Sequence, residues 1–195
     1  MNDPTLPSMP DAAAYWDGQP DPPAFDDGAP RPVVWAALGP DAAEYEWLRL
    51  NEWVEALRRV FNIPATIVPP FWHRHQLLVE HLSALHTHWL AAYDPDQHGS
   101  APFGWVRDFD EWKNRMREAV SQLGCRIDSC RDVASTRWPG EPEPDPDEHP
   151  PLVILADRYD DFVTVVLWDV RRRRRVEREQ IGQAVERADR DGGLL

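Results

Sequence analysis

Apolar side chains between residues 41 and 123 recur every three or four positions, the period of an amphipathic helix with one buried face. We predict that the first helix starts at Gly39-Pro40, because proline suits the first helical position and Asp41 and Glu44 lie near the positive end of the helix dipole. Asn62 and Pro64 end it. Its apolar stripe comprises Leu50, Trp53, Val54, Leu57, Val60 and Phe61.

Two further helices follow the same rule. We expect the second to start at Pro69-Pro70 and to end at Asp94-Pro95, with Phe71, His75, Leu78, Leu82, Leu85 and Trp89 on one face. The third is expected to start at an N-cap in Asp108–Glu111 and to end at Gly124. Its stripe holds Phe109, Trp112, Met116, Val120 and Leu123. Three amphipathic helices in series predict a mainly α fold, a small helical bundle.

The C-terminal pattern after Pro151 permits two structures. The stretches 152–155 and 162–168 are rich in β-branched residues, so a hairpin fits. Asp160 and Asp161 can instead cap a helix in which Phe162, Val163, Val166 and Val170 share one face. We favour a long, Arg-rich helix from about Asp160 to Arg187.

Proline and uncompensated negative charge concentrate in two segments outside the predicted bundle. Residues 1–39 hold eight prolines and few aliphatic side chains, which predicts a disordered acidic arm; we expect only Val33-Val34-Trp35 to fold back on the core. Residues 139–151 read as a Pro-rich acidic linker. The predicted organisation is therefore an arm (1–39), a helical domain (40–138), a linker (139–151) and a mostly helical C-terminal segment (152–195).

The formal net charge of −13 comes mainly from the arm and the linker. Such a surface repels phosphate and anionic lipid, which disfavours nucleic acid and membrane as partners. The chain shows no signal peptide and no apolar run of membrane-spanning length. We therefore expect a soluble, cytoplasmic protein with an unknown protein partner.

Five of the seven histidines lie in the second predicted helix. Two ligands on one helix meet at one ion only when they are three or four residues apart, and no pair of these histidines has that spacing. We predict no metal ligands and no cofactor on this basis. Instead we interpret His75 and His86 as core-edge residues with satisfied nitrogens, and His73, His81 and His88 as solvated.

Cys125 and Cys130 are the only cysteines, and no CxxC spacing is present. Small buried apolar groups are the simplest interpretation of both. A zinc site would need His75 or His81 together with these two thiols. Hydrolase, P-loop, dinucleotide-binding and zinc-protease motifs are absent. We therefore name no catalytic residues and favour a protein that is not an enzyme.

Two sets of residues are candidates for contacts with other molecules. Tryptophans outside the predicted stripes favour protein contacts, and we select Trp16, Trp35 and Trp138. Five consecutive arginines surround a helix on all sides and suit phosphate binding, although Glu177 and Glu179 can pair with them. These phosphate-contact candidates are Arg171, Arg172, Arg173, Arg174 and Arg175.

The spacing of tryptophan and histidine residues also resembles that of a known group of proteins. Residues 70–75, 82–85 and Trp89, followed by 105–110 and Gly124-Cys125, are similar to small uncharacterised actinobacterial proteins of plasmids, prophages and conjugative elements. The resemblance implies a helical fold and a mobile-element setting, with no activity or functional residue to transfer. Our leading hypothesis is a non-enzymatic protein-interaction module, an accessory protein of a mobile genetic element. The alternatives are a nucleic-acid-associated regulator acting through Arg171–Arg175 and a metal-binding protein that uses histidine and cysteine.

Overall fold

Four α-helices make up most of the described chain, which contains no β-strand and so confirms the mainly α fold. The structure is a computed structural model that describes residues 30–130, 138–141, 151, 153, 154 and 156–192. The helices are α2 (Pro40–Val60), α3 (Gln76–Ala92), α4 (Ala101–Leu123) and α5 (Arg158–Gly192). Short 3₁₀ turns precede two of them, namely η1 (Trp35–Ala37) before α2 and η2 (Trp72–Arg74) before α3.

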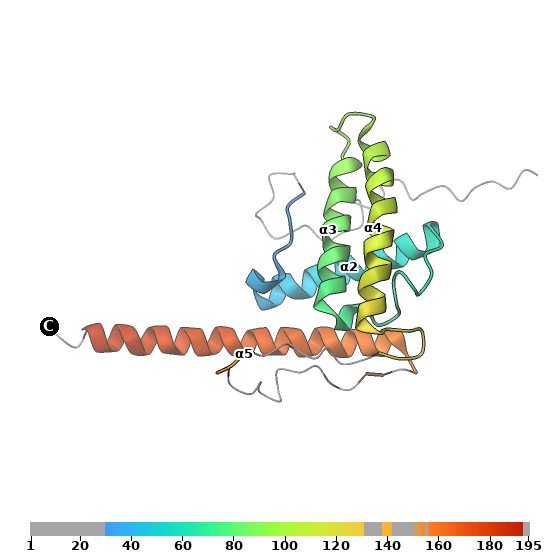
Figure 1. Cartoon of the computed structure of the whole chain (residues 1–195). Coiled ribbons are helices and arrows are strands. Elements are labelled where there is room, and N and C mark those ends of the chain that lie inside the picture. Colours follow the sequence, from blue (N-terminus) through green and yellow to red (C-terminus); the bar gives the residue numbers. More distant parts are fainter. Residues whose placement is uncertain (1–29, 131–137, 142–150, 152, 155, 193–195) are drawn as a thin grey trace, which may run out of the picture.

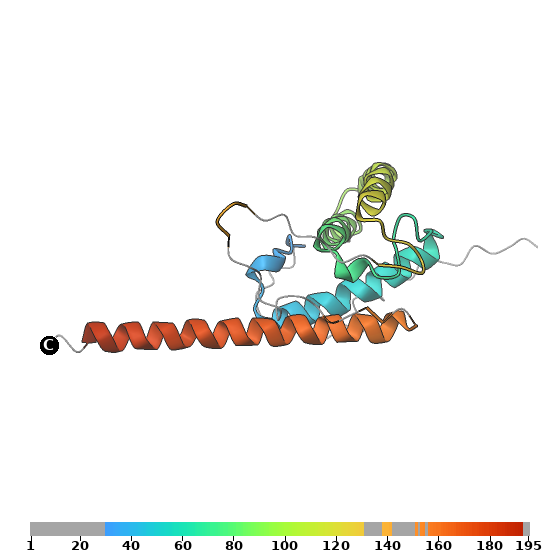
Figure 2. The ribbon, with the colours of Figure 1, turned by 60° about the horizontal axis from the view of Figure 1, so that its bottom comes forward.

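The helices α3 and α4 form an antiparallel pair; α2 crosses behind the lower part of this pair, and α5 runs below it (Figure 1). Helix α3 packs on both α4 and α2, while α5 packs along α2. Seen from another side, α2 lies between α5 and the α3–α4 pair (Figure 2). One apolar core joins all four helices, and its largest side chains are seven tryptophans: Trp35, Trp47, Trp53, Trp72, Trp89, Trp105 and Trp112. None of the described helices is both long and apolar enough to cross a membrane.

Helix α2 begins where the sequence predicts. Gly39 is the extended N-cap residue and Pro40 occupies the first turn, where a missing N–H costs nothing. The helix ends when the N–H of Phe61 bonds to the carbonyl of Leu57, and the next residue, Asn62, has a φ of 48° in the left-handed region. A non-glycine residue adopts this conformation with least strain when it is asparagine or aspartate, which explains the stop.

The predicted start of the second helix at Pro69-Pro70 is wrong. Residues 72–74 form the 3₁₀ turn η2, and His75 has extended backbone angles (φ −119°, ψ 105°), so α3 begins only at Gln76. The break coincides with tertiary contacts, since His73 and Arg74 both reach Asp161 in α5. A helix running straight through this segment would turn these side chains to different sides.

The predicted start of the third helix at Asp108 is also wrong, because α4 begins seven residues earlier, at Ala101. Pro102 lies in its first turn, a position that tolerates proline. Asp108 therefore lies inside the helix, where its carboxylate contacts His88 and Arg107. Gly124 ends α4 in the left-handed conformation, as predicted.

Helix α5 decides between the two structures predicted for the C-terminal segment. Residues 158–192 are helical, so the hairpin is wrong for 162–168. The carboxylate of Asp157 accepts hydrogen bonds from the N–H groups of Tyr159 (2.7 Å) and Asp160 (3.2 Å), so Asp157 provides the cap expected from its neighbours. Packing ends near Arg175: side chains from Val176 to Ala188 are exposed, and this half of the helix extends past the others (Figures 1 and 2).

Trp35 belongs to the core, so its selection as a partner contact is wrong. The expected fold-back is confirmed for Val33 and Trp35, whereas Val34 is 60% exposed. The side chain of Trp35 is buried, and its indole N–H donates to the hydroxyl of Ser83 at 2.8 Å. Trp138 is 74% exposed, so it is accessible to a partner. Trp16, the rest of the arm up to residue 29 and linker residues 142–150 lie outside the described residues.

Candidate metal centre

Two cysteines flank a short loop directly after α4. Gly124 has a φ of 68°, and its N–H bonds to carbonyls in the last turn of α4, which directs the chain out of the helix. Within the loop, the N–H of Arg126 donates to the carbonyl of Ser129 at 2.9 Å. This bond closes the loop and brings Cys125, which is buried, near Cys130, which is partly buried.

His75 lies at the junction between η2 and α3. Its carbonyl accepts hydrogen bonds from the N–H groups of Leu78 and Val79, so the main chain of His75 starts the helix. Its extended backbone turns the side chain away from the helix, and the ring is almost completely buried. The break that the sequence pattern did not predict therefore sets the direction of this imidazole.

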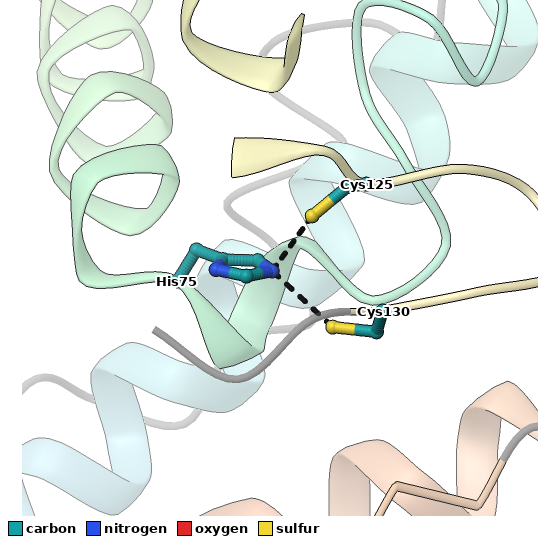
Figure 3. A group of neighbouring side chains, drawn as sticks. All are labelled: His75, Cys125 and Cys130. Carbon is teal, nitrogen blue, oxygen red and sulfur yellow. Dashed lines mark hydrogen bonds between the residues drawn. The ribbon is translucent and has the colours of Figure 1, made fainter. Parts of the chain in front are cut away.

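The imidazole and the two thiols converge (Figure 3). The Nε2 atom of His75 lies 2.7 Å from Sγ of Cys125 and 3.2 Å from Sγ of Cys130. The nitrogen and the two sulfurs all lie within 4.8 Å of one another, and no other set of three such ligand groups converges within the described ranges. We call these three residues the HCC cluster.

The charge state of the cluster depends on hydrogen bonding. The hydrogen bond with Cys125 and burial together raise the pKa of the Cys130 thiol far above its ordinary value, and the contact with His75 only partly offsets this. The thiol is thus protonated at neutral pH unless a cation stabilises the thiolate. A bound metal ion supplies that stabilisation by displacing the proton.

The donor set matches zinc. Zinc binds cysteine sulfur at about 2.3 Å and histidine nitrogen at about 2.0–2.1 Å in a tetrahedron. In that geometry each sulfur lies about 3.6 Å from the nitrogen. The observed separations of 2.7 and 3.2 Å are shorter, so each sulfur needs to move away from the nitrogen by about 0.4–0.9 Å to admit the ion. Displacements of this size are within reach of small side-chain rotations on a loop.

The histidines differ from the sequence interpretation in three places. The Nδ1 of His75, expected to be satisfied, has no hydrogen-bond partner. His73, expected to be solvated, is buried, and its Nε2 lies 2.8 Å from Asp161. His86 is buried as expected and stacks on Trp53, but its Nε2 has no hydrogen-bond partner. Burial, aided by nearby Arg49, lowers the pKa of His86 to about 3. His81, the alternative ligand in the zinc hypothesis, does not belong to the HCC cluster.

From the sequence, Asp161 is a possible helix cap, and its contacts with residues before α3 are not predicted. Its fully buried carboxylate accepts hydrogen bonds from His73, from Arg74 and from the N–H of Ile154. Burial alone would raise its pKa, but these bonds outweigh burial and hold the pKa well below the ordinary value. The carboxylate is therefore ionised and fixes η2 against the first turn of α5. An aspartate near the start of a helix usually indicates a cap, so its position in the sequence did not indicate a contact with η2.

The arginine run is largely engaged within the molecule. Arg172 and Arg173 contact Asp169, which also accepts the indole N–H of Trp47 at 3.0 Å. Arg173 also donates to the carbonyls of Trp35 (2.9 Å) and Leu38 (2.8 Å). Arg174 pairs with Asp41 and approaches Glu44. Arg171 is exposed, and Arg175 is partly buried. Three of the five phosphate-contact candidates thus have carboxylate partners in the chain itself.

Comparisons with protein-family models, curated proteins and solved structures find no match to this chain. Functional inference therefore rests on the geometry of its own residues.

Proposed function

We propose that this protein is a zinc-binding helical module in which His75, Cys125 and Cys130 hold one Zn²⁺ ion. The observation that carries the proposal is the convergence of one imidazole nitrogen and two sulfurs. Mixed nitrogen and sulfur donors favour zinc over magnesium or calcium, which prefer oxygen. A water molecule or another group outside this set completes the tetrahedron.

The role of the metal ion follows from the two segments of chain that supply its ligands. His75 belongs to the start of α3, and both cysteines belong to the segment after α4. A zinc ion bound by all three would cross-link the lower ends of the antiparallel pair, and its binding energy would add to folding energy. This cross-linking is the structural role that we propose for the ion.

The wider setting remains our sequence-based proposal. An accessory protein of a mobile genetic element would use the acidic arm and exposed aromatic groups such as Trp138 to engage a protein partner. The exposed half of α5 adds a surface that this hypothesis did not include. The engaged arginines make nucleic-acid contact through 171–175 the weaker alternative.

Elemental analysis of the protein purified with zinc in the medium tests the proposal. We expect about one zinc per chain in the wild type and loss of stoichiometric zinc in H75A, C125S and C130S. The matched control is H81A, which removes a neighbouring imidazole outside the cluster and should keep the metal. Circular dichroism confirms that each variant retains its helices. A wild-type protein without stoichiometric zinc would exclude the proposed function.

A further inference from the structure

Three consecutive residues take part in two different networks. His73 and Arg74 bond to Asp161 of α5, whereas His75 points at Cys125 and Cys130. All three side chains are buried or nearly so. The HCC cluster and the contact between η2 and α5 therefore share one short segment of main chain.

The contact with α5 is rigid because Asp161 has several partners. The Nε2 of His73 lies 2.8 Å from one carboxylate oxygen, and the Nε of Arg74 donates to the same oxygen at 2.7 Å. Arg74 also reaches the other oxygen through Nη2, and the carbonyl of Pro151 through Nη1 at 2.7 Å. Separating one partner leaves a buried ion unpaired, which is strongly unfavourable. Residues 73 and 74 thus have little freedom.

This rigidity extends to His75. Its N–H bonds to the carbonyl of Trp72 at 3.1 Å, which closes the turn that contains His73 and Arg74. With the turn fixed by Asp161 on one side and by the start of α3 on the other, the imidazole of His75 is held facing the thiols. Groups that hydrogen-bond directly to a metal ligand commonly change metal affinity by 10–100-fold when they are removed. Asp161 acts through the neighbouring residues of the main chain, so its removal should have an effect at the lower end of that range.

We infer that Asp161 is a positioning residue of the HCC cluster, acting through His73 and Arg74, and that zinc binding and docking of the first turns of α5 strengthen each other. This inference rests on the proposed zinc site. Reciprocity follows from linkage: if docking of α5 raises the affinity for zinc, zinc stabilises the docked helix by the same factor.

The coupling should be local to the start of α5. Further along α5, Asp169 accepts the indole N–H of Trp47 in α2, and Arg173 donates to the carbonyls of Trp35 and Leu38. These contacts do not pass through η2. We therefore expect loss of zinc to loosen the segment around 157–165 while the helix stays on α2.

Zinc affinity, measured by competition with a chelator, tests the inference on the full chain. We expect D161N to bind zinc about 10-fold more weakly than the wild type. Two matched controls should stay within about twofold: D160N, which changes the exposed neighbouring carboxylate, and D169N, which removes the other buried carboxylate of α5. A cobalt(II) spectrum at saturation should shift in D161N and not in D169N, because only Asp161 orients a ligand.

Hydrogen exchange of the wild type with and without zinc provides a second measurement that needs no variant. We expect zinc to slow amide exchange in residues 158–165 at least tenfold more than in 166–173. Two results would overturn the inference. In one, the wild type binds zinc and D161N binds it with the same affinity. In the other, D161N and D169N lose zinc affinity to the same extent. If D161N does not fold, the hydrogen-exchange measurement on the wild type decides: the inference is wrong if zinc does not slow amide exchange in residues 158–165. A wild type that binds no zinc refutes the proposed function instead.

Discussion

The Nε2 atom of His75 lies 2.7 Å from Sγ of Cys125, although 50 positions separate the two residues in the chain. The antiparallel packing of α3 and α4 creates this proximity, because it places the start of α3 beside the end of α4 (Figure 1). The helical hairpin thus closes at the end opposite its connecting loop, where a metal ion can cross-link it.

Zinc should stabilise the wild-type protein against unfolding. At free zinc one hundred times above the dissociation constant, we expect a gain of about 2.7 kcal/mol. The gain should disappear in C130S, which removes one sulfur from a partly buried position. Thermal melts at several zinc concentrations provide the measurement. S129A, altered one position away, should retain the gain, and a zinc-independent wild-type melting temperature would contradict the expectation.

Arg173 should matter for stability more than any other member of the arginine run. Its guanidinium bonds to Asp169 and to the carbonyls of Trp35 and Leu38, so R173A leaves buried polar groups without partners. We expect it to lower the free energy of unfolding by about 2 kcal/mol. R171A, at an exposed neighbour, should change it by less than about 0.5 kcal/mol. Urea titration measures both, and equal effects would show that these contacts are unimportant.

Acid should destabilise the protein partly through His86. Its folded pKa is lowered to about 3 by burial, whereas the unfolded imidazole titrates near 6.5. Its contribution is therefore complete above about pH 6.5 and is lost as the pH falls toward 3, by at most about 1.4 kcal/mol per pH unit. H86F keeps an aromatic ring against Trp53 and removes this titration.

The expected result is a shallower decrease in unfolding free energy between pH 6.5 and 4 for H86F than for the wild type. H98Q, which removes an exposed imidazole, is the matched control. Parallel pH profiles for H86F and the wild type would show that His86 does not contribute.

The end of the predicted arm should matter for stability because it contains Trp35. Deleting residues 1–29, which the sequence predicts to be disordered, should leave the unfolding free energy unchanged within about 0.5 kcal/mol. Deleting 1–39 also removes the buried Trp35 and its bond to Ser83, which should cost about 3–5 kcal/mol. Differential scanning calorimetry compares the two truncations, and similar melting temperatures would place Trp35 outside the core.

Sequence periodicity predicted the helices well and their starts less well. The start of α2 was predicted correctly because Gly39-Pro40 is a local signal that depends on no distant contact. The start of α4 was missed because Asp108 resembles a cap, whereas its carboxylate in fact contacts His88 across the hairpin. For α5, the pattern predicted correctly that Phe162, Val166 and Val170 share the buried face, since all three side chains are buried.

The candidate site was only partly predictable. Histidine spacing argued against a metal site within the second predicted helix, and His75 with Cys125 and Cys130 appeared among the hypotheses. What selects His75 over His81 is the break before α3, where His73 and Arg74 contact Asp161, 88 and 87 positions away in the chain. A contact between such distant residues leaves no trace in local spacing. The same reason hid the burial of His73.

X-ray absorption spectroscopy of the zinc-loaded protein tests the central claim most directly, because it reports the atoms bound to the metal. The account predicts two sulfur ligands at about 2.3 Å and nitrogen or oxygen ligands at about 2.0–2.1 Å, including one imidazole. C130S should lose one sulfur from this shell. A shell of nitrogen and oxygen alone in the wild type would contradict the assignment of His75, Cys125 and Cys130 as the zinc site.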